Sequence, residues 1–158
     1  MTERAPHRNQ WLMLAGFLGV VAVVAVVGGL AATSAKEVYA RLEQPPWAPP
    51  ASVFGPVWTV LYITIAVAGW LYWRTDGETR GFAVYGIGLL FNLLWTPLFF
   101  EGRAAGLALA DIVLLDAVVV VTIVLFGRRS KAAAALLVPY LGWILFATAL
   151  NTAVVVLN

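Results

Sequence analysis

Five apolar stretches, each close to the length that crosses a lipid bilayer, constrain this 158-residue chain more than any other feature. The hydrocarbon core of a bilayer is about 30 Å thick, so an α-helix needs about 20 apolar residues to cross it. The sequence predicts such helices over residues 11–33, 52–73, 81–100, 104–126 and 132–157. Only helices and closed barrels satisfy every backbone polar group in lipid. The predicted fold is therefore an all-α integral membrane protein, a five-transmembrane-helix bundle forming one domain over residues 1–158.

A composition of 62% hydrophobic and 11% charged residues agrees with this class and excludes several others. A water-soluble protein of this size needs more polar surface to cover its core. The formal net charge of +2 is too small and too scattered for nucleic-acid binding. Because the chain has no cysteine and a single histidine, His7, we expect no metal site and no disulfide.

The first apolar stretch has two interpretations. Arg4 and Arg8 precede it, and the small residues Ala31 and Ala32 lie near its end, as in a secretory signal peptide. The stretch over residues 11–33 is longer than the apolar region of such a peptide, which has about 7 to 15 residues. A first membrane span is therefore the favoured interpretation.

Basic residues are divided unequally between the two ends of the predicted bundle. The N-terminal tail and the second and fourth loops carry Arg4, Arg8, Arg74, Arg80, Arg128, Arg129 and Lys131. The first and third loops carry Lys36, Arg41 and Arg103. Because cytoplasmic loops are enriched in Lys and Arg, this division predicts a cytoplasmic N-terminus and an external C-terminus. The bilayer that we expect is a bacterial cell membrane.

The loop over residues 36–50 contains a proline-rich segment, QPPWAPP, at residues 44–50. Proline fixes φ and removes a backbone donor, so the four prolines of this segment exclude a helix. We expect a stiff, extended cap over the outer end of the bundle, with Trp47 at its centre. The helical pattern that follows places Trp58 and Tyr62 one turn apart on one helix face.

Polar and aromatic residues gather in the outer half of several predicted spans. With a rise of 1.5 Å per residue, Trp58 and Asn151 lie roughly 9 Å below the outer ends of their helices, and Asn92 lies roughly 10 to 12 Å below. Trp95 and Phe99 share a helix face with Asn92. Because these levels coincide, the sequence predicts an aromatic cavity beneath the cap.

Two deeper residues extend this picture. Trp143 lies roughly 20 Å from the outer end of the fifth span and shares a face with Ala147 and Asn151, so we expect it to form the cavity floor. Asp111 lies roughly 10 to 12 Å deep in the fourth span. A carboxylate in lipid is costly, which makes Asp111 either a functional group or a structural one held by an indole or hydroxyl. Asp116 is about 140° around the helix, so the two aspartates do not form an acid and base pair.

These residues also have structural interpretations. Tryptophans in membrane spans commonly pack against other helices or anchor the interface, as we expect of Trp11, Trp70 and Trp73. Asn92 and Asn151 are equally consistent with hydrogen bonds between helices.

Small residues indicate close helix contacts. Gly81 and Gly88 share a face of the third span. This face fits either a homodimer interface or packing inside one bundle.

Three motifs together resemble the TspO/MBR family of tryptophan-rich sensory and translocator proteins. They are PPWAPPASVFGPVWTVLY at residues 45–62, FNLLWTPLFF at 91–100 and VPYLGWILFATALN at 138–151. The resemblance extends from about Lys36 to the C-terminus. It implies a five-helix bundle, often a homodimer, that binds tetrapyrroles such as protoporphyrin IX and, in some members, cholesterol and benzodiazepine-site ligands.

The resemblance also implies which residues contact the ligand. By motif position they are Trp47, Trp58, Asn92, Trp95, Phe99, Asp111, Trp143, Ala147 and Asn151. No covalently bound cofactor is implied. The sterol motif of the family ends in Tyr and a basic residue, whereas this chain ends in VVVLN, so sterol binding at that place is not expected.

Three function classes fit these features. The favoured one is a membrane protein that binds and senses tetrapyrroles. The second is an enzyme that degrades protoporphyrin IX with light and oxygen, for which the resemblance implies Trp58 and Trp143 as the candidate residues. The third is a transporter of porphyrins or other small apolar ligands. Transporters commonly show repeated halves with broken helices, which five spans do not provide.

Overall fold

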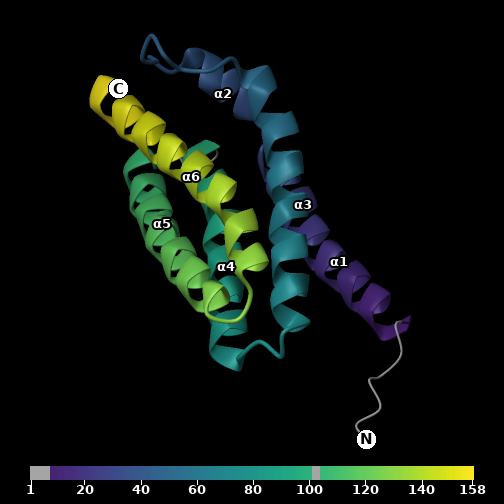
Figure 1. Ribbon diagram of the computed structural model, residues 1–158. Helices are drawn as coiled ribbons and strands as arrows, with labels where there is room; N and C mark the ends of the chain where they lie inside the picture. Colours follow the sequence, from purple (N-terminus) through teal and green to yellow (C-terminus); the bar gives the residue numbers. More distant parts are fainter. Residues whose placement is uncertain (1–7, 101–103) are drawn as a thin grey trace, which may run out of the picture.

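The computed structural model describes residues 8–100 and 104–158, and this part of the chain is helical without strands (Figure 1). The elements are α1 (Arg8–Ala31), α2 (Ala35–Arg41), the 3-10 turn η1 (Ala51–Val53), α3 (Phe54–Trp73), α4 (Thr79–Phe100), α5 (Ala105–Gly127) and α6 (Lys131–Leu157). Within the described residues, five helices are long and apolar enough to cross a bilayer. The predicted all-α membrane fold is confirmed.

Helix boundaries lie close to those of the predicted spans. The largest difference is in α1, which begins at Arg8 rather than at residue 11 and ends at Ala31 rather than at residue 33. A helix can continue into polar residues at the bilayer surface. A hydropathy pattern therefore locates the ends of the apolar stretch rather than the ends of the helix. The helix α1 packs along α3 and α4, as a first membrane span should.

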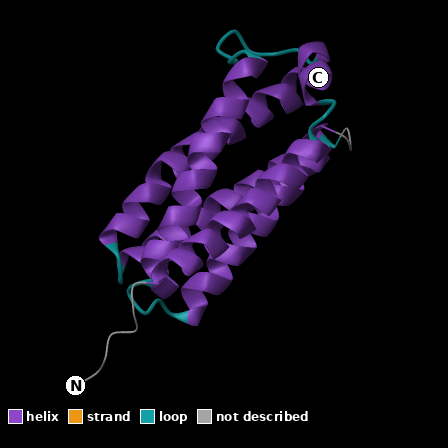
Figure 2. Cartoon of the chain, turned by 90° about the vertical axis from the view of Figure 1, so that its right-hand side faces the viewer, coloured by secondary structure: helices purple, strands orange, loops and turns teal. Residues whose placement is uncertain are grey.

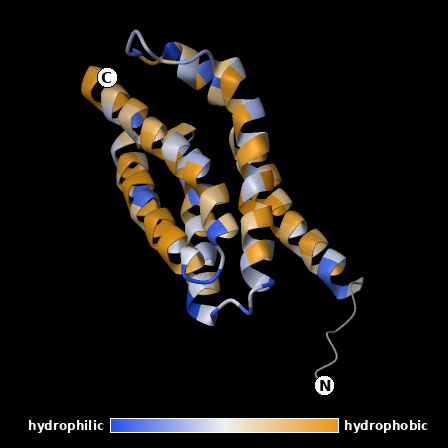
Figure 3. Cartoon of the chain, in the orientation of Figure 1, coloured by the Kyte–Doolittle hydropathy of each residue, from blue (hydrophilic) through white to orange (hydrophobic). Residues whose placement is uncertain are grey.

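The helices form a ring in which α1 contacts α3, α3 contacts α6, α6 contacts α5, α5 contacts α4 and α4 contacts α1. Figures 1 and 2 place the beginning of α1 and the C-terminus at opposite ends of this bundle, which we call the N-terminal end and the C-terminal end. The N-terminal end also holds the α3–α4 and α5–α6 turns, and the C-terminal end holds α2. Figure 3 shows hydrophobic residues along the helix walls and hydrophilic residues mainly at the turns, which is the distribution that a bilayer requires.

Aromatic rings close the N-terminal end of the bundle. Tyr72 of α3 stacks on Phe126 of α5 with ring centroids 4.0 Å apart, and Tyr85 of α4 lies 5.7 Å from the same ring. Gly81 provides the space, because a Cβ atom there would lie less than 3.0 Å from the Tyr72 hydroxyl and ring. A Cβ atom at Gly88 would lie 3.4 Å from a side-chain carbon of α5.

The shared face of Gly81 and Gly88 is therefore packed inside one bundle. Both glycines are buried, one against α3 and the other against α5. Of the two interpretations of this face, the structure shows the internal contact. A homodimer through another surface stays a prediction.

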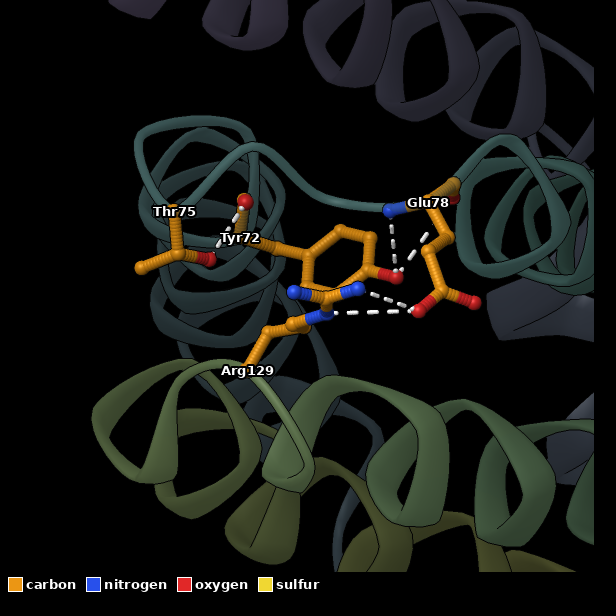
Figure 4. Close-up of polar contacts among 4 residues, drawn as sticks. All are labelled: Tyr72, Thr75, Glu78 and Arg129. Atoms are coloured by element: carbon orange, nitrogen blue, oxygen red, sulfur yellow. Dashed lines mark hydrogen bonds and ion pairs between the residues drawn. The ribbon is translucent and has the colours of Figure 1, made fainter.

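Hydrogen bonds fasten the two turns at the N-terminal end (Figure 4). The Tyr72 hydroxyl accepts a hydrogen bond of 2.9 Å from the Glu78 backbone N–H, and Thr75 donates to the Tyr72 carbonyl. Arg129, from the α5–α6 turn, pairs with the Glu78 carboxylate at 2.7 Å. The hydrogen bond and the charge of Arg129 lower the pKa of Glu78, so the pair stays ionised at neutral pH.

The connection over residues 36–50 corrects one expectation. We expected a non-helical loop, but residues 35–41 form the helix α2. The sequence of α2, AKEVYAR, lacks proline and contains good helix formers. The prolines begin only at residue 45, so they do not prevent a helix before that position. Residues 44–50 are non-helical, as predicted, but they are not extended throughout, because the Ala48 backbone N–H donates a hydrogen bond of 2.9 Å to the Pro45 carbonyl and closes a turn.

Specific contacts hold this connection on the bundle. The Tyr39 hydroxyl donates a hydrogen bond of 2.9 Å to the Pro49 carbonyl, and the Gln44 amide donates to the Tyr39 carbonyl. The side chain of Asn158 exchanges two hydrogen bonds of 3.0 Å with the backbone of Glu43. The C-terminus and the connection are thus joined at one end of the molecule.

Candidate ligand-binding cavity

A cavity of about 470 Å³ lies inside the C-terminal end of the bundle, between α1, α2, α3 and α4. Its volume falls within the range of roughly 300 to 1,000 Å³ that is typical of small-molecule sites. The lining of the cavity consists of Ala25, Gly28, Gly29, Ala32, Ala35, Lys36, Tyr39, Ala51, Ser52, Phe54, Gly55, Trp58, Thr59, Tyr62, Trp95, Thr96 and Phe100. Most of these side chains are apolar or aromatic, so the cavity is predominantly apolar.

The aromatic wall comes from α3 and α4. Trp58 and Tyr62 are one helical turn apart, with ring centroids 5.3 Å from each other. Trp95 stacks on Phe99 with centroids 5.1 Å apart. Only Trp95 of this second pair faces the cavity, since Phe99 is buried behind it. Phe100 completes the cavity-facing side of α4. Helix spacing alone had suggested the preceding residue, Phe99.

The opposite wall comes from α1 and is made of small residues. Ala25, Gly28 and Gly29 recur at i, i+3 and i+4, which places them on one face of α1, and Ala32 follows directly after the end of this helix. The absence of side-chain bulk on this face leaves the space that the aromatic rings of α3 and α4 border. Sequence reasoning missed this wall, although the spacing of small residues is a signal that could have located it.

The roof of the cavity is α2 rather than the proline-rich segment. Ala35, Lys36 and Tyr39 line the cavity from above, whereas residues 44–50 are absent from the lining. Tyr39 packs edge-on against Phe54 with centroids 5.4 Å apart. Burial raises the pKa of Tyr39, which keeps its hydroxyl protonated as the donor to the Pro49 carbonyl.

Asn92 lies directly behind the aromatic wall and is only 4% exposed. The Tyr62 hydroxyl donates a hydrogen bond of 2.9 Å to the Asn92 side-chain oxygen. The Asn92 amide in turn donates to the Tyr140 hydroxyl at 3.0 Å. This network joins α3, α4 and α6 and fixes the orientation of Tyr62 at the cavity.

Asn151 holds the other aromatic residue of the wall. The Trp95 indole N–H donates a hydrogen bond of 3.2 Å to the Asn151 side-chain oxygen, and the Asn151 amide donates to the Ala105 carbonyl at 3.0 Å. Asn151 is almost fully buried. The two asparagines therefore serve as hydrogen-bonding groups between helices, one of the two roles that the sequence allowed them.

Trp143 lies directly behind a lining ring of the cavity, and Trp47 lies two further ring contacts away. The Trp143 ring packs edge-on against Phe54 at 5.8 Å and lies 5.5 Å from Phe146, and of these two rings only Phe54 lines the cavity. Trp47 contacts Phe146 at 5.8 Å and remains 51% exposed. Trp47 thus packs against α6 at the C-terminal end, while Trp143 supports the Phe54 wall.

The remaining predicted residues are on α5 and α6. Asp111 and Ala147 are buried and lie outside the cavity lining. Asp116 accepts a hydrogen bond of 2.8 Å from Thr148, which connects α5 with α6. Of the nine predicted ligand residues, the structure brings Trp58 and Trp95 to the cavity surface. Contact of the other seven with a bound ligand stays a prediction.

The lining offers several kinds of chemical group. Aromatic faces, five hydroxyl-bearing side chains and one amine border the space, and the lining includes no carboxylate or imidazole among the residues that the structure describes. The arrangement therefore defines a helical membrane protein with an aromatic-lined cavity near one end.

Comparison with known proteins identifies the family. A sequence model of the TspO/MBR family matches residues 17–157, so the chain belongs to this family. It is 40% identical to the tryptophan-rich protein TspO of Archaeoglobus fulgidus over 148 residues, covering 92% of this chain and 96% of the relative. The tryptophan-rich sensory protein of Cereibacter sphaeroides is 34% identical over 148 residues, with 94% and 92% covered. The human translocator protein is 40% identical over 118 residues, with 72% and 70% covered.

Proposed function

We propose that this protein is a membrane sensor or regulator that binds a tetrapyrrole such as protoporphyrin IX in the cavity beneath α2. The observation that carries the proposal is the cavity of about 470 Å³ with Trp58, Tyr62 and Trp95 on its wall. A flat conjugated ring buries its two large faces most favourably against aromatic side chains. Two relatives carry names that describe a tryptophan-rich protein and a sensory protein, which supports the choice of function class.

The energetic basis of this binding is burial of apolar surface. Each square ångström removed from water or a polar interface contributes about 25 cal/mol, and an aromatic contact adds to this. Loss of one wall tryptophan should therefore cost roughly 1 to 3 kcal/mol of binding free energy. A cost of this size lowers the affinity by about tenfold or more.

A spectral titration of the purified protein with protoporphyrin IX in darkness tests the proposal. Trp58→Ala and Trp95→Ala should each weaken binding by about tenfold or more. Trp73→Ala is the matched control, because Trp73 lies on α3 about 22 Å along the helix axis from Trp58. Equal losses in all three variants would indicate general destabilisation, and binding unchanged in all three would place the site elsewhere.

Illumination of the same samples separates sensing from turnover. If the protein is a sensor, the absorbance of bound porphyrin should change under light no faster than that of free porphyrin. Faster loss of porphyrin absorbance would instead support the light-dependent enzyme. Movement of porphyrin across the membrane of protein-containing vesicles would support the transporter.

We also propose that the N-terminal end of the bundle faces the cytoplasm of a bacterial cell. The support is the unequal division of Lys and Arg between the two ends. The cavity, at the C-terminal end, then opens toward the outer leaflet side.

A further inference from the structure

Lys36 is the charged residue of the cavity lining. Among the described residues that border the cavity, all others are apolar, aromatic or hydroxyl-bearing. Lys36 is an exposed residue on the α2 side of the cavity, which we call its mouth. A cation in this place gives an otherwise apolar cavity one polar end.

The fold fixes Lys36 at the mouth. It lies in α2, three residues before Tyr39, so the two residues share a helix face. Tyr39 is held by its contact with Phe54 and its hydrogen bond to the Pro49 carbonyl. Figure 1 shows α2 lying across the end of the bundle above α3. The position of Lys36 therefore depends on a roof that is itself anchored.

Polarity changes from the mouth to the interior of the cavity. Ser52 of η1, which is also exposed, lines the cavity too and precedes α3 in the chain. Trp58 and Tyr62 follow roughly 9 to 15 Å further along α3. A ligand with an apolar ring and an acidic group would place the ring deep and the acid at the mouth. There the ammonium and the hydroxyl can both donate hydrogen bonds to carboxylate oxygens.

We propose that Lys36 determines ligand specificity by receiving a carboxylate of the bound molecule, so that the cavity selects flat apolar acids over neutral esters of the same ring. This inference rests on the proposed function, because it concerns the same cavity. An ammonium group that is open to water gives a modest gain, since water and salt screen the charge. The expected effect is about fivefold in affinity.

The test compares protoporphyrin IX with its dimethyl ester, which has the same ring and no carboxylate. Both are titrated in darkness into the full-length protein, Lys36→Met, Lys36→Glu and Arg41→Met, in one detergent. Arg41→Met is the matched control, because Arg41 is an exposed basic residue of α2 outside the cavity lining. The ratio of acid to ester affinity is the quantity compared.

We expect Lys36→Met to lower this ratio about fivefold and to leave ester affinity unchanged. Lys36→Glu should lower the ratio further, because it replaces attraction by repulsion. Arg41→Met should keep the ratio of wild type. Added salt should weaken acid binding in wild type more than in Lys36→Met.

Two results would overturn the inference while leaving the proposed function intact. One is that wild type binds both the acid and the ester, and that Lys36→Met leaves the ratio of acid to ester affinity unchanged. The other is an equal loss of acid and ester affinity in Lys36→Met, which would indicate a packing role for Lys36. Absence of binding of both probes to wild type would overturn the proposed function and the inference together.

Discussion

Asn92 shows how one polar side chain controls the shape of an apolar cavity. Its two hydrogen bonds connect Tyr62, on the cavity wall, with Tyr140, inside the bundle. A buried polar group without a partner costs about 1 to 3 kcal/mol. The asparagine therefore stabilises both tyrosine hydroxyls in the interior of the bundle.

Asn92→Leu should lower stability by roughly 2 to 6 kcal/mol, because two hydroxyls lose their partner at once. Thermal unfolding in detergent, followed by circular dichroism, measures the change. Thr59→Val is a suitable control, since Thr59 is exposed and its hydroxyl bonds only to the Gly55 carbonyl one turn before it. Equal melting temperatures for wild type and Asn92→Leu would show that the network contributes nothing to stability.

The sequence predicted the depth of the site residues along their helices better than the direction in which their side chains point. Depth along a helix follows from a fixed rise of 1.5 Å per residue, so Trp58, Asn92, Trp95 and Asn151 were placed correctly at one end of the bundle. Direction depends on the rotation of each helix against its neighbours, which helix periodicity alone does not determine when lipid and protein faces are both apolar. This is why the depth argument could not separate Trp95, which faces the cavity, from Phe99, which is buried behind it.

At the scale of elements, α2 and α1 account for what the sequence did not predict about the cavity. Proline excludes a helix at residues 44–50, but the residues before that segment are free to form one. The resulting helix α2 covers the cavity from above. The glycine and alanine face of α1 has no polar or aromatic side chain. Residue type therefore gave no reason to assign this face to a ligand site.

Gly81 of α4 leaves the space that the Tyr72 side chain of α3 occupies. A Cβ atom there would lie less than 3.0 Å from Tyr72, which is almost fully buried and stacked on Phe126. Gly81→Ala should therefore destabilise the protein by about 1 to 3 kcal/mol, despite the higher helix propensity of alanine.

Gly86→Ala provides the matched control in the same helix. Its added Cβ would meet nothing within 4 Å, so it should leave stability unchanged or raise it by up to about 1 kcal/mol. Thermal unfolding of the two variants compares their stabilities. A Gly81→Ala protein as stable as Gly86→Ala would contradict the internal role of this face.

At the scale of the whole molecule, the two ends of the bundle differ in construction. The N-terminal end is closed by stacked rings and by the ion pair of Arg129 with Glu78. The C-terminal end holds the cavity under α2. The sequence predicted the number and alternation of the spans because a bilayer requires a minimum length of apolar helix. It could not predict the shape of the cavity, which depends on how the helices pack.

The orientation of this asymmetric molecule follows from its basic residues. A reporter fused after Gly77, in the α3–α4 turn, should give a cytoplasmic signal in bacterial cells, and one fused after Asn158 should give an external signal. The reverse pair of signals would place the cavity on the cytoplasmic side.

The central claim is that the cavity between α1 and the aromatic wall is the place where a tetrapyrrole binds. Gly28 is buried on α1, lines this cavity and faces Thr96, so a leucine there would extend into the space. Gly16 lies on the same helix and is exposed, and a Cβ atom added there would meet nothing within 4 Å, so a leucine at this position would face the surroundings.

The most direct measurement is therefore a titration of protoporphyrin IX into Gly28→Leu and Gly16→Leu, with the melting temperature of each variant recorded beside it. We predict that Gly28→Leu binds at least about tenfold more weakly than wild type at an unchanged melting temperature, while Gly16→Leu binds as wild type does. Wild-type affinity in Gly28→Leu would contradict the central claim, because a ligand in this cavity cannot share the space with a leucine side chain.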